Sequence, residues 1–316
     1  MPPRVSPTTS SGRYERPREL NRIVARGPVA HRMRFREITL TAAAMVCFAA
    51  NSILCRLALA PALIDAATFT SVRVISAAAM LSLVIASQRR HLPRMTRASP
   101  FSAAALFGYL AFFSFAYTRL DAGSGALILI GAVEFTMLTI AFREGERFTG
   151  TQWAGLTIAI LGFFYLVLPG AGAPDALGAV LMTMSGVSWG FFSLLARGAH
   201  DPVEANAGNF LCCLLPAVIV NLFGIHQLEV TPAGVALAAA SGAIATGLGY
   251  VVWYLALRDL PAAHAATVQL SMPALVALGG VAFLSEPLTV RLVAASIAML
   301  GGVALVLRHR IEKTGD

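Results

Sequence analysis

Charged residues are scarce in this sequence. Asp, Glu, Lys and Arg make up only 13% of the 316 residues, while 57% are hydrophobic and the mean hydropathy is +0.72. Because a soluble domain carries about a quarter charged residues, this composition excludes an ordinary soluble protein. We expect an integral membrane protein instead.

Cysteine is also scarce, and the motifs of metal sites and of enzymes are missing. The four cysteines fall in hydrophobic runs without a CxxC or Cys/His spacing, so we expect no disulfide, no metal site and no other cofactor. The sequence has no HExxH motif, aspartate-rich pair or P-loop. We therefore do not expect an enzyme, and a membrane-integral enzyme that acts on lipid is kept only as an alternative.

Hydrophobic runs recur from residue 38 to residue 307. Each has about 20 residues, which is long enough to cross a hydrocarbon core of about 30 Å as a helix. The runs are continuously apolar rather than alternating, which favours helices over a membrane β-barrel. We predict an all-α integral membrane protein with ten transmembrane helices. Their expected ranges are 38–57, 65–88, 100–118, 121–142, 150–169, 176–198, 204–223, 232–256, 261–284 and 288–307.

The net charge of +8 arises largely at the N-terminus, where 9 of the 24 basic residues precede residue 37. The segment 1–37 has no apolar core of a signal peptide. We expect a disordered cytoplasmic arm that lies on anionic membrane lipid, and we expect no nucleic-acid partner. A second interpretation is that translation starts at Met33 and that the arm is not part of the protein.

The basic segments between the spans are expected to face one side of the membrane. The loops of the opposite side hold only Arg56, Arg119 and Arg291. Because cytoplasmic loops are enriched in Lys and Arg, we expect both termini, including the tail 308–316, in the cytoplasm. The predicted location is the inner (cell) membrane. The basic segments are 89–97, 142–147, 195–200, 256–259 and 308–313.

The two halves of the chain resemble each other. Arg56 returns 141 residues later as Arg197, and Glu146 returns 140 residues later as Glu286. Each half contains five predicted spans, an odd number, so the second half is expected to be inverted in the membrane. Inverted repeats are typical of secondary transporters that bind their substrate near the midplane.

The second-half stretch GLGYVVWYLALRDLPAAHAATVQLSMPALVALGGVAFLSEPLTVRLVAASIAMLGGVALVL and the first-half stretch REGERFTGTQWAGLTIAILGFFYLVL resemble the EamA repeat of the drug/metabolite transporter (DMT) superfamily. The resemblance implies two inverted five-helix repeats, over 38–169 and 176–307, with a central cavity and alternating access without ATP hydrolysis. Many members of this family export amino acids and other small metabolites. The first repeat departs from the pattern at Val133, the position equivalent to Pro273, which leaves open whether the fourth span is kinked.

Glu134 lies deep in the fourth predicted span, about 20 Å from its outer end at 1.5 Å per residue. A charge at that depth is costly, so this residue must face a cavity, find a partner or be protonated. We name Glu134 as a candidate for proton coupling or for binding a substrate amine. The alternative is a structural carboxylate that bonds to a neighbouring helix.

Arg73 and Asn51 lie in the second and first predicted spans, at depths of about 12 and 10 Å. Arginine is always charged, so Arg73 must be paired or hydrated. A contact with Glu134 is conceivable, but the family resemblance favours a role for Arg73 in holding helices together. Asn51 either lines the cavity or bonds neighbouring helices, and the second role is favoured.

Gln269 lies in the ninth predicted span, about 12 Å from the inner surface. Because Pro273 has no N–H, the carbonyl of Gln269 is freed from its helical hydrogen bond, which creates a polar point near the midplane. His264, closer to the surface, is expected at the membrane interface rather than in a proton relay.

Trp189 falls near the midplane, between Gly186 and Gly190, which allow two helix backbones to approach closely. It either stacks on a substrate or packs in the core. Trp153 and Trp253 lie near inner helix ends, where we expect them to anchor the protein at the membrane interface.

Glu146 and Glu286 directly precede the fifth and tenth predicted spans. Thr149 and Gln152 form a possible capping box at the start of the fifth. We therefore expect the two glutamates to organise helix starts.

Together these features predict a secondary transporter that exports a small metabolite or drug-like solute. Its central cavity is expected among the first, third, fourth, sixth, eighth and ninth spans. The candidate residues for substrate binding or coupling are Glu134, Arg73, Gln269, Trp189 and Asn51, with the proton as the coupling ion. A passive facilitator or a lipid scramblase would share these features and is the alternative.

Overall fold

The computed structural model describes residues 28–93, 99–145, 147–196, 199–224, 230–258 and 262–314. The chain divides into two compact units, residues 1–39 and 40–316. The described part of the first unit is helical, and the Thr39 hydroxyl donates a hydrogen bond to the carbonyl of Phe35, at 2.8 Å. The second unit contains the rest of the chain, including the cavity.

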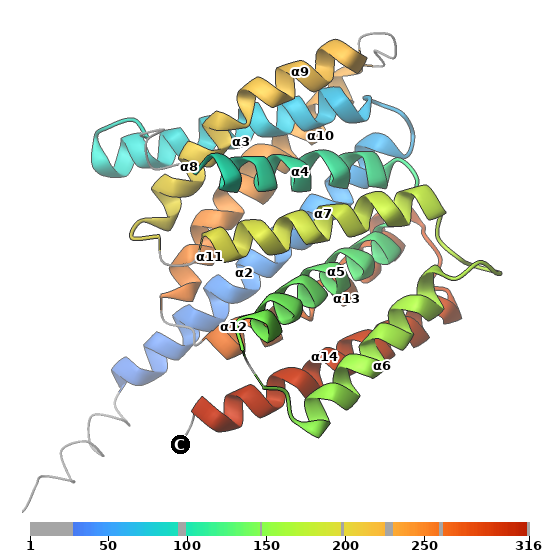
Figure 1. Ribbon diagram of the computed structural model, residues 1–316. Helices are drawn as coiled ribbons and strands as arrows, with labels where there is room; N and C mark the ends of the chain where they lie inside the picture. Colours follow the sequence, from blue (N-terminus) through green and yellow to red (C-terminus); the bar gives the residue numbers. More distant parts are fainter. Residues whose placement is uncertain are drawn as a thin grey trace, which may run out of the picture. The chain divides into compact units, whose positions relative to one another are not determined.

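The described chain is built from helices, and successive membrane spans run in opposite directions (Figure 1). Its elements in chain order are α2 (Pro28–Leu59), α3 (Ala66–Arg89), α4 (Pro100–Tyr117), α5 (Ala122–Arg143), α6 (Gly150–Val167), α7 (Ala176–Leu195), α8 (Pro202–Cys212), α9 (Leu214–Gly224), α10 (Pro232–Ala240), the π-helix η3 (Ser241–Leu248), α11 (Gly249–Leu257), α12 (Ala262–Gln269), α13 (Met272–Leu284) and α14 (Val290–Thr314). Outside these helices the described residues contain one isolated β-bridge, between Ile64 and Val230. Ten spans are long and apolar enough to cross a membrane, which confirms the ten predicted helices.

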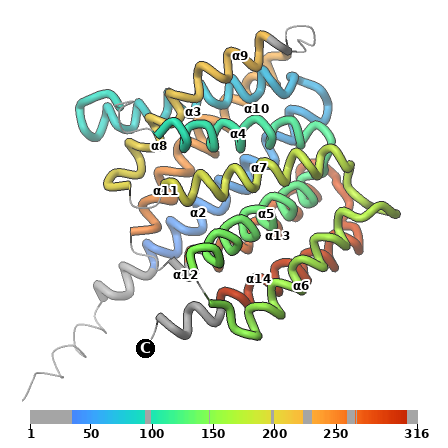
Figure 2. The backbone as a smooth tube through the Cα atoms, in the orientation of Figure 1, coloured from blue at the N-terminus to red at the C-terminus, as the bar shows by residue number. Residues whose placement is uncertain are grey.

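Three of the ten spans are interrupted, and all three lie in the second half of the chain. Figure 2 follows the backbone through the breaks between α8 and α9, through η3, and between α12 and α13. The first break, at Cys213, precedes Pro216, which has no N–H to give to the carbonyl of Cys212. The last break lies directly before Pro273. The equivalent span of the first half, α5, continues without a break through Val133 and Glu134.

The helices pack in pairs and triplets of identifiable neighbours. Helix α7 packs between α4 and α5, α6 pairs with α14, α13 packs on α5, and α3 lies against η3, α9 and α10. Helices α3 and η3 approach closely at Gly242, where a Cβ atom would lie 2.0 Å from the hydroxyl of Ser76 and 2.2 Å from the carbonyl oxygen of Arg73. The backbones of α3 and η3 are therefore in direct contact.

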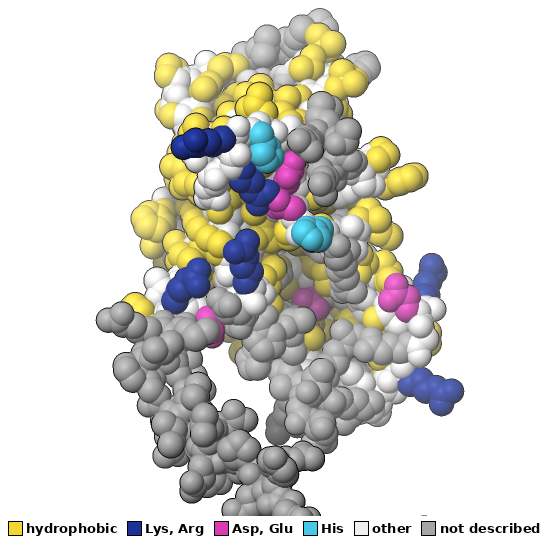
Figure 3. Space-filling view, turned by 90° about the vertical axis from the view of Figure 1, so that its left-hand side faces the viewer, with side chains coloured by type: hydrophobic (Ala, Val, Ile, Leu, Met, Phe, Trp, Pro, Cys, Tyr) yellow, Lys and Arg dark blue, Asp and Glu magenta, His cyan; other side chains and the backbone are white. Residues whose placement is uncertain are grey.

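The second unit has two ends that differ in their charged residues. The Arg56 end is the one where α2 ends and α5 begins, and the α12 end is the opposite one. Figure 3 views the side that is on the left in Figure 1 and shows basic, acidic and histidine side chains among hydrophobic ones. Arg89, at the end of α3, forms ion pairs with two residues at the start of α8. These are Asp201 and Glu204, and the pair with Glu204 has a distance of 3.4 Å.

Candidate functional site

A cavity of about 60 Å³ lies among six of the ten spans. Its walls come from α2, α4, α5, α7, the η3–α11 segment and the α12–α13 segment, and therefore from both halves of the chain. These are the first, third, fourth, sixth, eighth and ninth spans, the six that were expected around a central cavity. The lining residues are Phe48, Asn51, Ser52, Tyr109, Phe113, Leu129, Ile130, Trp189, Ala245, Thr246, Tyr250, Trp253, Gln269 and Met272.

Aromatic rings form much of the wall. The ring of Trp189 lies 4.8 Å from that of Tyr109 and stacks on that of Tyr250 at 5.7 Å. Phe48 contacts Tyr250 and Trp253 edge-on, at 5.8 and 6.0 Å. Such faces bind apolar groups by area and cations by their quadrupole, so the wall suits an amphipathic solute.

Trp189 reaches this wall because α7 approaches α5 closely. A Cβ atom at Gly186 would lie 2.6 Å from both the Cβ atom of Ala132 and the carbonyl oxygen of Leu129, and one at Gly190 would lie 2.9 Å from Thr136. The expected close approach at the two glycines is therefore confirmed. It leaves the indole of Trp189 at the cavity rather than between the helices.

Asn51 both bonds a neighbouring segment and lines the cavity. Its Oδ1 atom accepts a hydrogen bond from the hydroxyl of Ser241 at 2.8 Å and a longer one, 3.5 Å, from Thr246. Both partners belong to η3, whose wider turn places two hydroxyls toward α2. A π-helical turn inside an α-helix is frequent at functional sites.

Gln269 is the last residue of α12, and it lines the cavity at the break before α13. The chain turns at Leu270 and Ser271, whose N–H groups donate to the carbonyls of Thr267 and Val268 at 3.2 and 3.0 Å. Because Pro273 has no N–H, the carbonyl of Gln269 has no helical donor four residues on. The polar point expected near the midplane thus coincides with a real interruption of the helix.

Arg73 lies directly behind the cavity wall, with its side chain fully buried on α3. Its Nη2 donates to the hydroxyl of Tyr109 at 3.3 Å and its Nε to that of Thr246 at 3.5 Å. Its guanidinium carbon lies 4.9 Å from the centre of the Phe113 ring. All three contacts are with cavity-lining residues, whereas its Nη1 has no hydrogen-bond partner among the described residues.

Glu134 lies one helical turn from the lining residue Ile130 on the same face of α5, on the side of the α12 end. It is 8% exposed and is not itself among the residues that line the cavity. The structure therefore places Asn51, Trp189 and Gln269 on the cavity, and Arg73 and Glu134 next to it.

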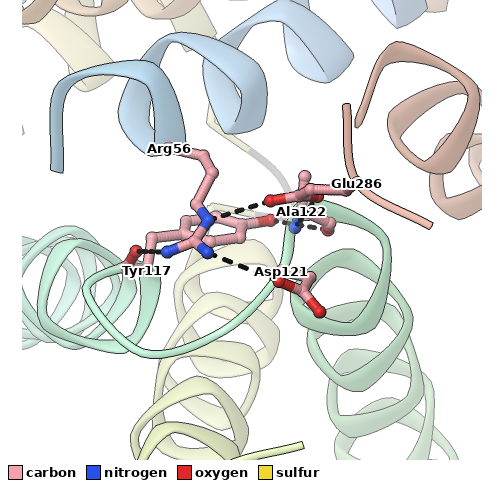
Figure 4. Close-up of polar contacts among 5 residues, drawn as sticks. All are labelled: Arg56, Tyr117, Asp121, Ala122 and Glu286. Carbon is pink, nitrogen blue, oxygen red and sulfur yellow. Dashed lines mark hydrogen bonds and ion pairs between the residues drawn. The ribbon is translucent and has the colours of Figure 1, made fainter. Parts of the chain in front are cut away.

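A polar cluster lies at the Arg56 end, one turn beyond the lining residue Ser52 (Figure 4). The Nε of Arg56 binds Glu286 at 2.9 Å, its Nη1 donates to the carbonyl of Tyr117 at 3.1 Å, and its Nη2 lies 3.4 Å from Asp121. Glu286 also accepts from the backbone N–H of Ala122 at 2.8 Å. The cluster joins α2, the α4–α5 connection and the α13–α14 connection, which come from both halves.

This arrangement corrects the expected role of Glu286. The start of its own helix, α14, is capped by the hydroxyl of Thr289, which accepts from the N–H of Leu292 at 3.1 Å. Glu286 binds the start of α5 and Arg56 instead. The signal was present in the sequence, because Arg56 and Glu286 are both repeated residues. At the start of α6, the predicted capping box of Thr149 and Gln152 is confirmed.

Trp253 corrects a second expectation. It is only 6% exposed and lines the cavity, so it does not anchor the protein at the membrane surface. Trp153, with 47% of its surface exposed, remains compatible with that role. Glu146, Arg197 and the side chain of His264 lie outside the described residues.

Comparison with known proteins gives this geometry a context. The profile of the EamA-like transporter family matches residues 35–168 and 176–308. An uncharacterised protein of Pseudomonas aeruginosa is 48% identical over 88% of this chain and 96% of its own length. The threonine/homoserine exporter RhtA of Escherichia coli strain K12 is 31% identical over 56% of this chain and 62% of the exporter.

The fold is also found among solved structures. One crystal structure superposes with a TM-score of 0.56, at 19% sequence identity, and the match covers 84% of this chain and 97% of that chain. At this identity the likeness concerns the fold alone.

Proposed function

Because the chain belongs to the EamA-like transporter family and is thus a membrane transporter of the DMT type, we propose that it exports a small amphipathic metabolite by alternating access. The observation that carries the proposal is the cavity of about 60 Å³, which is walled by spans from both halves of the chain. Substrate sites between two repeats are the rule in secondary transporters.

The proposed cargo is amino acid-like. The relative RhtA is named as an exporter of threonine and homoserine, and the wall of this cavity combines aromatic rings with the side chains of Asn51, Thr246 and Gln269. Such a wall offers hydrogen bonds to the polar end of a solute and area to its apolar part.

The proposed state of the structure is closed at the Arg56 end. Arg56 lies one turn, or about 6 Å, beyond Ser52 on α2. Its contacts with Glu286 and Asp121 join segments of both halves there. The basic residues Arg89, Arg90 and Arg143 lie at the α12 end, which supports a cytoplasmic position for that end and for both termini. The cavity then faces the cytoplasm, and the proposed location of the protein is the inner membrane.

The proposed coupling residue is Glu134. It is a buried carboxylate one turn from the cavity wall on α5, and an ionisable residue inside a membrane span is by default a functional one. Protonation from one side and release to the other would couple outward transport to the proton gradient.

The test uses cells that express the protein and proteoliposomes that contain it. Expressing cells should enrich at least one small metabolite in the medium relative to cells with an empty vector. In proteoliposomes, an imposed pH gradient should drive that compound uphill, and Glu134→Gln should abolish the response to the gradient. Glu204→Gln is the matched control, because Glu204 is equally buried and lies away from the cavity, where it pairs with Arg89.

The outcomes separate the alternatives. No enriched compound would overturn the export function. Flux that only runs downhill would indicate a passive facilitator, and an unchanged pH response in the Glu134→Gln variant would remove Glu134 from the coupling step.

A further inference from the structure

The cavity has a permanent positive charge behind its wall. Arg73 is 0% exposed, and its guanidinium contacts the lining residues Tyr109, Phe113 and Thr246. An arginine cannot lose its proton in a protein, so this charge is present in every state of the transporter.

No carboxylate of the described residues forms an ion pair with Arg73. The ion pairs of Arg56, Arg89 and Arg119 lie at helix ends instead. Among the described residues, those that line the cavity include no acidic side chain, and the Nη1 atom of Arg73 has no acceptor. A buried charge without a directly bonded counter-charge is costly, which points to a partner that comes with the ligand.

Tyr109 connects Arg73 to the cavity that it lines. Its hydroxyl oxygen accepts from the guanidinium at 3.3 Å, so the hydroxyl keeps its own proton for an acceptor in the cavity, whereas the hydroxyl of Thr246 donates to the Oδ1 of Asn51 at 3.5 Å. A carboxylate in the cavity would receive a charge-assisted hydrogen bond from Tyr109.

A purely structural role would not require this charge. Helix α3 is already held against η3 by backbone contact at Gly242, where a Cβ atom would lie 2.2 Å from the carbonyl oxygen of Arg73. The hydroxyl of Ser71, on α3, also donates to the carbonyl of Ala217, on α9, at 3.0 Å. An apolar side chain in place of Arg73 would pack at this contact without the cost of a buried cation.

We infer that the cargo is a small carboxylate, such as an α-amino acid, and that Arg73 selects it by placing a buried positive charge behind Tyr109 and Thr246. This inference rests on the proposed export function of the same cavity. The aromatic wall takes the apolar body or the ammonium group, while amines without a carboxylate meet the positive charge of Arg73 with no group to bind it and are rejected.

The first experiment determines the class of the cargo. The medium of expressing cells is compared with that of empty-vector cells by untargeted mass spectrometry. Enrichment of carboxylates is expected. If nothing is enriched, the export function itself fails; if the enriched compounds lack a carboxylate, the export function stands and the inference about Arg73 is overturned.

The second experiment isolates the charge. Thermal stabilisation and binding are measured on purified wild-type protein and on Arg73→Gln and Arg73→Lys. The probes are L-threonine with L-threoninamide and 1-amino-2-propanol, and L-phenylalanine with L-phenylalaninamide and 2-phenylethylamine. The wild type should prefer the acid within at least one set. Arg73→Gln should weaken the binding of the acid about 10- to 100-fold, the range for a hydrogen bond to a charged group, and leave the binding of the amide nearly unchanged.

Two further variants keep the test decisive. Arg73→Lys keeps the charge and should retain part of the acid preference. If Arg73→Gln does not fold, Tyr109→Phe, which removes only the hydroxyl, should still reduce the preference for the acid. The matched control is Arg291→Gln, because Arg291 binds the backbone carbonyls of Tyr165 and Ala171 at the end of α6 and should lower stability without changing the acid-to-amide ratio. A wild type that binds acid and amide equally, or an Arg73→Gln variant that folds and keeps the preference, would contradict the inference.

Discussion

The polar cluster at the Arg56 end should set how often the transporter opens there. Glu286 connects α13–α14 to Arg56 at 2.9 Å and to the N–H of Ala122 at 2.8 Å, and its side chain is only 14% exposed. These contacts join segments that must separate for the cavity to open at this end. The substitution Glu286→Gln keeps the shape of the side chain but removes its charge.

The size of the effect follows from the contacts that are lost. A hydrogen bond to a charged group contributes about 1.5–3 kcal/mol net, so losing the charge should cost the closed state about 2 kcal/mol. Since 1.4 kcal/mol is a factor of ten, the population open at the Arg56 end should rise about 30-fold. The equilibrium shifts this far only if the contact is absent from the open state.

The assay measures access to the cavity from outside the cell. Ala245, which lines the cavity, is replaced by cysteine in a background without the four native cysteines, and intact cells are treated with a membrane-impermeant maleimide. Glu286→Gln should raise the labelling rate of the introduced cysteine by about 30-fold. Asp121→Asn is the matched control, because Asp121 is 57% exposed and 3.4 Å from Arg56, so its loss should change the rate by no more than about 5-fold.

The reasoning would be refuted by a folded Glu286→Gln protein with an unchanged labelling rate. It would also be refuted if Asp121→Asn had the larger effect. A reverse pair, Arg56→Glu with Glu286→Arg, should restore slow labelling if the charge pair itself holds this end closed.

Two further substitutions test the interrupted second half. Gly242→Ala should prevent folding or sharply lower the melting temperature, because its Cβ atom would meet the Ser76 hydroxyl at 2.0 Å. Gly301→Ala is the control, since nothing lies within 4 Å of that position. Equal stability of the two variants would contradict the packing. Pro273→Ala returns an N–H to the carbonyl of Gln269 and should close the break between α12 and α13. Transport in proteoliposomes should then fall, while the melting temperature holds or rises. Unchanged transport would show that the break is dispensable.

The ten spans were predictable because hydrophobic length is a direct property of sequence. Their interruptions were only partly predictable. Pro273 signalled the break in the ninth span, but nothing in the segment SGAIATGLG distinguishes a π-helix from an α-helix rich in small residues. The wider turn lies where α3 approaches Gly242 at backbone distance, a tertiary contact that the local sequence does not reveal.

The candidate site was predictable where polarity marked it. Asn51 and Gln269 stood out as polar residues in apolar spans, and both line the cavity. Tyr109, Phe113 and Tyr250 did not stand out, because an aromatic residue in a membrane span has the same pattern whether it faces lipid, core or cavity. Which face a residue presents is decided by close contacts between helices, such as the one at Gly186.

The two halves contribute different chemistry to one cavity. Asn51, Arg73 and Glu134 all belong to the first half, and the positions aligned with them in the second half hold Phe192, Leu214 and Ala274. The second half supplies irregular backbone instead, in η3 and at the break between α12 and α13.

These contributions meet at Arg73. Gly242 allows α3 and η3 to touch, and Thr246, one turn further along η3, then brings its hydroxyl to the guanidinium. An exact copy of the first half in the second would place two permanent charges around the cavity, and each would need its own counter-charge. A repeated fold with an unrepeated charge gives one end of the cargo a defined place, which is what discrimination between a carboxylate and its neutral amide requires.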